Sequence, residues 1–218
     1  APHPNNTPKH FSFGAPQNLE KWDASLRVSC IRQELFGALG FEVDVANETV
    51  IYRDNGHEVL RITRPPMAEF RAQLDLVHAY SDLRQDRGTE LRAQIGEIMS
   101  FIGQPLSLHP QRHSATIEFL FAAVGAVIEL EKPLKHVMAV RRPFELSSMI
   151  QPMITTPAHS AFPSGHTMEA FAMAEVLAGI VLKHDVKLHG ADGPVRDRRS
   201  YRLQMMAHAE RVATNRVV

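Results

Sequence analysis

Apolar residues recur every three or four positions through most of the chain after residue 65, which is the period of an amphipathic α-helix. The pattern predicts helices within residues 66–104, 114–140 and 164–183, and a last helix from about residue 200. A glycine inside such a pattern favours an interruption, so we expect a break or kink at Gly88. The predicted fold class is mainly α, a helical bundle.

The N-terminal part of the chain follows other patterns. Residues 1–22 are rich in proline and asparagine and lack periodicity, which predicts an extended arm. A helix is expected over residues 24–39, followed by β-branched residues at 41–63 around an Asn55–Gly56 pair. Asn-Gly between alternating apolar residues favours a hairpin turn, so we expect a small β-hairpin there. Residues 23–218 are expected to form a single helical domain.

Two segments interrupt the helical pattern with loop-forming residues. Residues 141–163 contain repeated prolines, which disfavour a helix both at and directly before their own positions. We expect a long irregular loop there, and loops of that length in compact domains usually carry function. A second loop is expected over residues 184–197, between the last two helices.

Composition narrows the class of protein. With 218 residues, 44% hydrophobic and 22% charged, the chain resembles an ordinary globular protein. Its 24 basic and 24 acidic residues cancel, so we expect neither nucleic acid nor membrane as a partner. The best candidate for a membrane span, Ile117–Leu130, contains two glutamates and predicts a buried helix. The first residues suit an exported mature chain, so we expect a secreted or periplasmic location, with a cytoplasmic one as the alternative.

Two basic residues precede the proline-rich segment. Lys135 and Arg142 are seven residues apart, so on a continuous helix they project from one face. Arg141 would point elsewhere, and Pro143 places Arg142 at the helix end. Basic residues also complement the dipole at helix C-termini, and this alternative stays open for the pair taken alone.

The segment FPSGHT, residues 162–167, opens the next helix with several polar groups. Free N–H groups and the positive dipole end at a helix N-terminus favour an anion. Gly165 allows close backbone approach, Ser164 adds a hydroxyl donor and His166 adds an acid–base group. A plain serine cap followed by an unrelated histidine is the alternative.

Together, these segments resemble the signature of type 2 phosphatidic acid phosphatases and vanadium-dependent haloperoxidases. The first two motifs of that family are Lys-x6-Arg-Pro and, about 20 residues later, Pro-Ser-Gly-His, and both are present. The third motif begins with an arginine, which Asn215–Arg216 matches. Its histidine, expected six residues later, and its aspartate would fall beyond Val218. The resemblance extends from about Ile117 to the end of the chain.

The resemblance implies an oxyanion site within a helical bundle of the phosphatase/haloperoxidase type. The positions implied to hold phosphate or vanadate are Lys135, Arg142, Ser164, Gly165, His166 and Arg216. His166 would be the catalytic acid, and Lys135 would polarise the bound oxygens. The third-motif histidine would be the phosphatase nucleophile or the vanadium ligand. No residue of this chain is therefore expected to ligate vanadium, and we expect a companion chain or further sequence to complete the site.

Two neighbouring positions favour a haloperoxidase. His159 stands where algal bromoperoxidases also carry a histidine, and Lys132 stands where they carry a cation. His159 therefore joins His166 and Lys135 as a catalytic candidate, although a polar loop residue is an equally open interpretation. The first expectation is a vanadate-dependent bromo- or iodoperoxidase-like enzyme that oxidises halide with peroxide. The alternatives are a soluble acid phosphatase that hydrolyses phosphate esters through a phosphohistidine, and a non-catalytic oxyanion-binding bundle.

Overall fold

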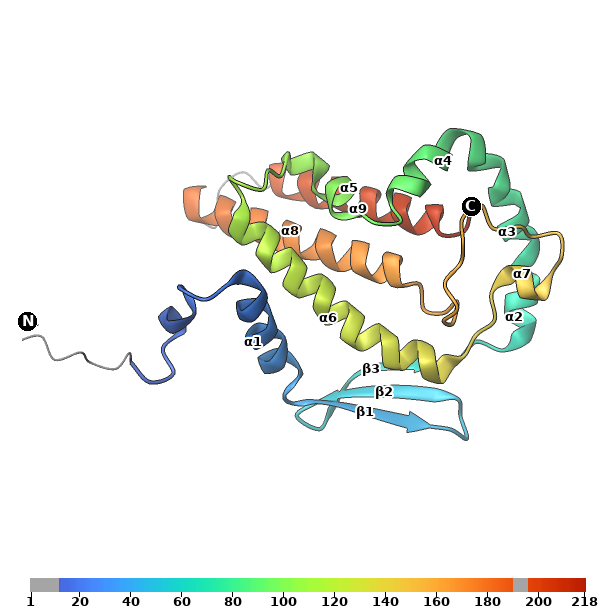
Figure 1. The fold of residues 1–218 in the computed structure, drawn as a ribbon, viewed down its shortest axis with the longest axis horizontal. Helices are drawn as coiled ribbons and strands as arrows, with labels where there is room; N and C mark the ends of the chain where they lie inside the picture. Colours follow the sequence, from blue (N-terminus) through green and yellow to red (C-terminus); the bar gives the residue numbers. More distant parts are fainter. Residues whose placement is uncertain (1–11, 190–195) are drawn as a thin grey trace, which may run out of the picture.

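The computed structural model describes residues 12–189 and 196–218, which form a helical bundle with a small sheet at one end (Figure 1). Its long helices are α6 (Ser114–Met138), α8 (Gly165–His189) and α9 (Arg196–Asn215). The other described helices are α1 (Ala24–Phe36), α2 (Met67–Ala72), α3 (Leu74–Tyr80), α4 (Arg84–Ala93), α5 (Met99–Gly103), α7 (Pro143–Leu146) and the 3-10 turns η1 (Pro16–Leu19), η2 (Ser81–Leu83) and η3 (Gln104–Leu106). The predicted mainly α class is confirmed. Of the predicted arm, residues 1–11 lie outside the described residues.

α8 packs against both α6 and α9 and supplies much of the buried core. The buried core residues of α8 and α9 are Ala170, Met173, Ala174, Leu177 and Ala178 on α8, and Met205, Ala209 and Val212 on α9. Their three- and four-residue spacing gives each helix one apolar face. Several of them are alanines, whose small side chains let the helices approach closely. This packing fixes where the ends of the three long helices lie relative to one another.

The predicted β segment forms a three-stranded antiparallel sheet, with strands in sequence order. The strands are β1 (Leu39–Asp44), β2 (Thr49–Asp54) and β3 (His57–Thr63). Between β2 and β3, Asn55 and Gly56 have φ angles of 47° and 81°. Positive φ at both positions is what a two-residue hairpin turn requires. The hairpin prediction is therefore confirmed, with a third strand added. The helix expected over residues 24–39 ends at Phe36, because Leu39 already belongs to β1.

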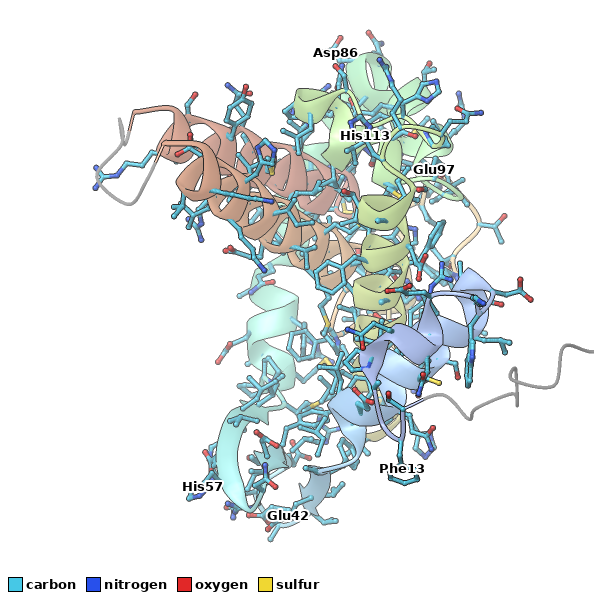
Figure 2. All side chains as sticks on the ribbon, turned by 90° about the vertical axis from the view of Figure 1, so that its left-hand side faces the viewer. Phe13, Glu42, His57, Asp86, Glu97 and His113 are labelled. Atoms are coloured by element: carbon cyan, nitrogen blue, oxygen red, sulfur yellow. The ribbon has the colours of Figure 1, made fainter. Side chains whose placement is uncertain are left out.

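The sheet is attached to the bundle through β2. Tyr52 is 4% exposed, and its hydroxyl donates a hydrogen bond to the Leu130 carbonyl of α6 at 2.6 Å. Burial raises the pKa of Tyr52 to about 12. Figure 2 shows the sheet, marked by Glu42 and His57, at the opposite end of the molecule from Glu97. The sheet therefore supports the C-terminal part of α6 from below in the view of Figure 1.

The break expected at Gly88 is wrong, because α4 continues through this residue. Gly88 is buried, and a Cβ added there would lie 2.5 Å from the Cε atom of Met153. Met153 belongs to the proline-rich segment between α7 and α8. The glycine therefore makes room for that segment instead of bending the helix, and the interruptions fall at Gln73 and at residues 81–83 and 94–98.

The second expected loop, residues 184–197, is mostly helical where the structure describes it. α8 continues to His189, and α9 begins at Arg196 instead of near Ser200. The prediction failed because residues 184–189 contain neither proline nor glycine, so polarity alone did not end the helix. Residues 190–195 lie outside the described residues.

The structure offers a candidate for a membrane span other than Ile117–Leu130, which lies within α6. Among the described residues, one helix segment, Gly165–Lys187, is long and apolar enough to cross a membrane, with a mean hydropathy of 1.3 over its best window. Charged residues interrupt the apolar stretches of α8, but this window contains at most two of them, so its mean hydropathy stays high. Core helices of soluble proteins pass the same criterion, so a single helix of this kind is weak support for a membrane span.

Candidate active site

The predicted oxyanion residues come from three helix ends that lie together in the bundle. The C-terminal end of α6, the N-terminal end of α8 and the C-terminal end of α9 all face the same side of the molecule; the α9 end lies close to α4, and the α6 end lies beside the sheet (Figure 1). The proline-rich segment that joins α7 to α8 passes along this side. Segments that are far apart in the sequence therefore supply neighbouring side chains here.

Lys135 lies in the last turn of α6 and is only 4% exposed. Its ammonium donates hydrogen bonds to the carbonyl oxygen of Pro163 and, at 3.4 Å, to that of Ser160. Burial lowers the pKa of Lys135, and the negative charge of Glu131, one turn earlier, opposes this shift. An ammonium carries three N–H donors, so these two carbonyls leave one donor for a ligand.

Arg142 does not share a helix face with Lys135, so that prediction is wrong. α6 ends at Met138, and Ala139 takes a left-handed conformation with φ of 47°. Arg142 then lies in extended geometry directly before α7, as expected for a residue that precedes a proline. The segment 141–163, predicted to be irregular throughout, contains this one short helix because proline is well tolerated in a first helical turn.

The Arg142 side chain nevertheless reaches the segment that Lys135 also contacts. Its Nε donates to the Pro157 carbonyl at 2.8 Å, and its Nη2 donates to the His159 carbonyl at 2.9 Å. The Nδ1 atom of His159 lies 3.4 Å from the same Nη2. Burial lowers the pKa of Arg142. Arg141 is exposed, which agrees with the expectation that the two neighbouring arginines differ.

Ser160 ties this segment to the end of α6. Its hydroxyl oxygen accepts a hydrogen bond from the Val140 N–H at 2.9 Å and donates to the Phe162 carbonyl at 2.9 Å. The Ala161 N–H donates back to the Val140 carbonyl at 3.0 Å. These bonds fix the carbonyl groups that receive Lys135, and they lead the chain into α8.

The start of α8 agrees with the prediction from FPSGHT. Gly165 is the first helical residue, and the Ser164 carbonyl accepts the first helical hydrogen bond, from Met168 N–H at 3.0 Å. The Ser164 hydroxyl oxygen accepts a hydrogen bond from the Thr167 hydroxyl at 2.9 Å. Its own hydrogen is therefore available to another acceptor.

Glu131 of α6 lies directly against Gly165. Its side chain is 2% exposed, and a Cβ added to Gly165 would lie 2.3 Å from its Oε2 atom. The Oε1 atom pairs with the Lys132 ammonium at 3.0 Å, whereas Oε2 is buried without a hydrogen-bond partner. A side chain at position 165 would therefore displace this carboxylate.

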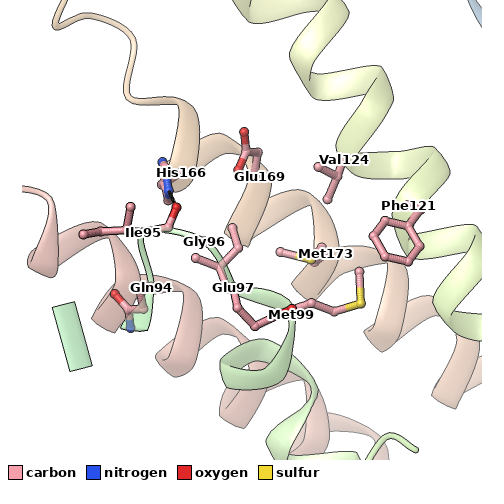
Figure 3. A pocket seen from close by; sticks show the side chains of 11 residues that line it. Gln94, Ile95, Gly96, Glu97, Met99, Phe121, Val124, His166, Glu169 and Met173 are labelled. Atoms are coloured by element: carbon pink, nitrogen blue, oxygen red, sulfur yellow. Dashed lines mark hydrogen bonds between the residues drawn. The ribbon is translucent and has the colours of Figure 1, made fainter. Parts of the chain in front are cut away.

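His166 and Glu169, one turn apart on α8, line a cavity of about 240 Å³. Figure 3 shows them on one side of this cavity and Phe121 and Val124 of α6 on the other. A ring nitrogen of His166, Nε2, lies 3.5 Å from the Ile95 carbonyl. Burial raises the pKa of Glu169, and the proximity of His166 opposes this shift. The acid–base candidate therefore stands at the edge of a cavity, beside a carboxyl group.

Arg216, directly after α9, is held by Gln94 at the end of α4. Gln94 is fully buried, and its Oε1 atom accepts hydrogen bonds from Arg216 Nη2 at 3.1 Å and from Asn215 Nδ2 at 3.0 Å. Its amide nitrogen donates to Glu90 at 2.9 Å. The Nε atom of Arg216 is buried and has no hydrogen-bond partner, and burial lowers the pKa of this guanidinium. A buried cationic N–H without an acceptor is suited to an anion.

A comparison with protein families identifies this half of the chain. Residues 115–217 match the sequence model of the PAP2 superfamily. These residues belong to the PAP2 superfamily. PAP2 proteins are generally phosphatases or haloperoxidases, enzymes of phosphoryl or oxyanion chemistry, and they are often membrane-associated or secreted. No curated protein and no solved structure matches the chain.

The PAP2 region contains every residue that the motifs singled out, but the structure divides them into two groups. Lys135, Arg142 and His159 meet along the segment before α8. Arg216 belongs to the second group through its partner Gln94, which lines the same cavity as His166. The catalytic and ligand-binding roles of these residues stay predictions.

Sequence reasoning missed several residues that shape this PAP2 site. Glu169 could have been found from its position three residues after His166, which places both on one helix face. The contact of Glu131 with Gly165 has no signal in the sequence. Gln94 lies outside the PAP2 match and reaches Arg216 only through tertiary packing.

The donors at this site fit phosphate or vanadate, which share a tetrahedral arrangement of oxygens. Arg216 Nε is unpartnered, Lys135 keeps one N–H, and the Nη1 group of Arg142 is not engaged by the carbonyls that hold Nε and Nη2. Cationic N–H groups of this kind form the stronger hydrogen bonds with oxyanions. The negative charge of Glu131 opposes such a ligand but is partly offset by Lys132.

Proposed function

We propose that the PAP2 region binds a tetrahedral oxyanion at the start of α8 and hydrolyses a phosphate ester there. The main support is Arg216, whose Nη2 is fixed by Gln94 while its buried Nε has no acceptor. An unsatisfied buried donor costs about 1–3 kcal/mol, and more when it is charged. A phosphate oxygen would remove that cost. The N–H groups and dipole of α8 favour the same negative charge.

Each candidate would have a separate task in this reaction. Lys135 and Arg142 would bind phosphate oxygens with their remaining N–H donors, and the Ser164 hydroxyl and Gly165 N–H would add hydrogen bonds. Hydrolysis adds one water across the P–O bond, so a hydroxyl joins phosphorus and a proton joins the leaving oxygen. His166 would deliver that proton from its imidazole ring.

Vanadate-dependent halide oxidation is the second candidate. It is supported by His159, whose ring lies 3.4 Å from Arg142. The residues that would bind phosphate would also hold vanadate, and bound vanadate supplies a Lewis acid that activates peroxide. Lys132, the other residue that favours a haloperoxidase, is largely exposed and paired with Glu131. Its ammonium is therefore already engaged, and we place phosphate-ester hydrolysis first.

Calorimetric titration of phosphate and of vanadate tests the binding site. Replacing Arg142 with alanine should weaken both ligands at least tenfold, because a guanidinium that contacts an oxyanion contributes about 1.4 kcal/mol or more. Replacing the exposed neighbour Arg141 with alanine is the matched control and should change neither affinity more than twofold. Thermal unfolding of both variants checks that the fold persists. Equal effects of the two substitutions would contradict the assignment of Arg142.

Activity is to be measured on the natural polypeptide, because the implied nucleophile is the third-motif histidine. Hydrolysis of p-nitrophenyl phosphate without vanadate is the expected result. Bromide oxidation with vanadate and peroxide, without ester hydrolysis, would favour the second candidate. Oxyanion binding with neither activity would leave a non-catalytic binding protein.

A further inference from the structure

On the basis of the proposed function, we infer that the cavity beside His166 holds the organic group of the phosphate ester, and that this group is compact and apolar. The cavity lies between the α4–α5 connection, α6 and α8. Figure 3 shows side chains from all three segments around it.

The cavity lies where ester cleavage would place the organic group of the substrate. The leaving oxygen receives its proton from His166, so the carbon attached to that oxygen must extend into space next to His166. His166 lines the cavity, and its Nε2 atom is 3.5 Å from the Ile95 carbonyl at the cavity wall. Gln94 lines the cavity as well and holds Arg216. The cavity therefore adjoins the proposed phosphate position from both the acid and the arginine.

The size of the cavity limits the organic group. Its volume is about 240 Å³, whereas an apolar protein cavity of about 150 Å³ is sufficient to bind benzene. One substituted aromatic ring or a short branched alkyl group fits this space. A nucleoside, with a base and a sugar, would not be enclosed.

One part of the cavity wall is apolar and favours an apolar organic group. Met173 is fully buried and Ile98 is 8% exposed, and Val124 and Met99 complete an apolar floor. Phe121, which is 58% exposed, forms the outer edge and can cover a bound ring. Methionine and phenylalanine side chains make favourable contacts with aromatic ligands.

Two carboxyl groups line the same cavity and select against a second negative charge. Glu169 stands beside His166, and Glu97 comes from the α4–α5 connection. In a partly desolvated space, a like charge on the organic group is repelled. Substrates with a second phosphate or a carboxylate are therefore disfavoured, and the expected class is the monoester of a neutral, apolar alcohol.

Non-hydrolysable phosphonates test this inference by calorimetric titration of the whole 218-residue chain. Benzylphosphonate should bind about tenfold more tightly than inorganic phosphate, and hydroxymethylphosphonate should bind no more tightly than phosphate. Val124→Trp, which fills the cavity, should remove the benzylphosphonate advantage and leave phosphate affinity within twofold. Val186→Trp, at an exposed position of α8, is the matched control and should change neither affinity. Phe121→Asp, at the exposed edge, should lower benzylphosphonate affinity about tenfold even if the tryptophan variant does not fold.

Each other outcome is informative. Equal affinity for benzylphosphonate and phosphate, with Arg142-dependent phosphate binding intact, would overturn the cavity assignment and leave the proposed function standing. Tight benzylphosphonate binding that survives both Val124→Trp and Phe121→Asp would place the ring elsewhere and also overturn it. If neither phosphate nor benzylphosphonate binds, the proposed oxyanion site itself fails, and the cavity assignment fails with it.

Discussion

Replacing Gly165 with alanine should destabilise the protein, although alanine is the better helix former. The added Cβ would lie 2.3 Å from Glu131 Oε2 and 2.9 Å from its carboxyl carbon, whereas ordinary contacts begin at 3.4 Å. The carboxylate would have to retreat by about 1 Å to reach a normal contact distance. Glu131 is 2% exposed and is paired with Lys132, so little space is available. Overpacking of this kind costs about 1–3 kcal/mol in the free energy of unfolding.

The same helix offers a matched control for this substitution. Gly179 also lies in α8, but no atom lies within 4 Å of the Cβ that alanine would add there. Gly179→Ala should therefore stabilise the protein by about 0.5–1 kcal/mol through helix propensity alone. Urea denaturation of both variants measures the two changes, which we expect to have opposite signs.

A double substitution identifies the cause of the Gly165→Ala effect. Adding Glu131→Ala removes the carboxylate that meets the new Cβ. The double variant should then be more stable than the sum of the two single effects predicts, by about 1–2 kcal/mol of coupling free energy. If Gly165→Ala is as stable as the wild type, or if the two substitutions are additive, the contact between Glu131 and Gly165 does not determine the residue at position 165.

Further predictions concern groups that hold the site in place. Gln94→Leu removes the acceptor of Arg216 Nη2 and should lower the free energy of unfolding, measured in urea, by about 2–3 kcal/mol. Gln85→Leu, at an exposed position of α4, is the control and should change it by less than about 0.5 kcal/mol. Equal losses would contradict the role of Gln94. Burial raises the pKa of Tyr52 to about 12 from an unfolded value near 10. The contribution of the neutral Tyr52 side chain to the free energy of unfolding is therefore complete below about pH 10 and is lost as the pH rises through 12. Tyr52→Phe should reduce this alkaline loss, which we expect to be about 2–3 kcal/mol in urea titrations at successive pH values. An unchanged pH profile would exclude Tyr52 as its source. Ser160→Ala removes the acceptor of the Val140 N–H and should lower the free energy of unfolding by about 1–2 kcal/mol, detected as a lower Tm. Phosphate binding should weaken as well if Ser160 positions the carbonyl groups around Lys135.

Local sequence signals predicted the elements whose cause is local. The helix of residues 114–138 follows from its three- and four-residue apolar period, and the turn at Asn55–Gly56 follows from the positive φ that these residue types tolerate. The same reasoning failed at Gly88, where the absence of a side chain serves a contact with Met153 and not a bend. It also failed between Lys135 and Arg142, because a helix face predicts neighbours only as far as the helix continues.

The sequence by itself determined the mainly α class, the polar start of α8 and the PAP2 motifs, because each depends on residues within one or two helical turns or on a fixed spacing. Only the tertiary structure decided which groups surround that helix start. Gln94 and Arg216 are separated by 122 positions and Ile95 and His166 by 71. They meet because α4 and α5 pack against α9, and α8 packs against both α5 and α6. That packing also places Glu131 against Gly165 and leaves the cavity beside His166. Such contacts depend on how several apolar helix faces are buried together, and no local stretch of sequence specifies that arrangement.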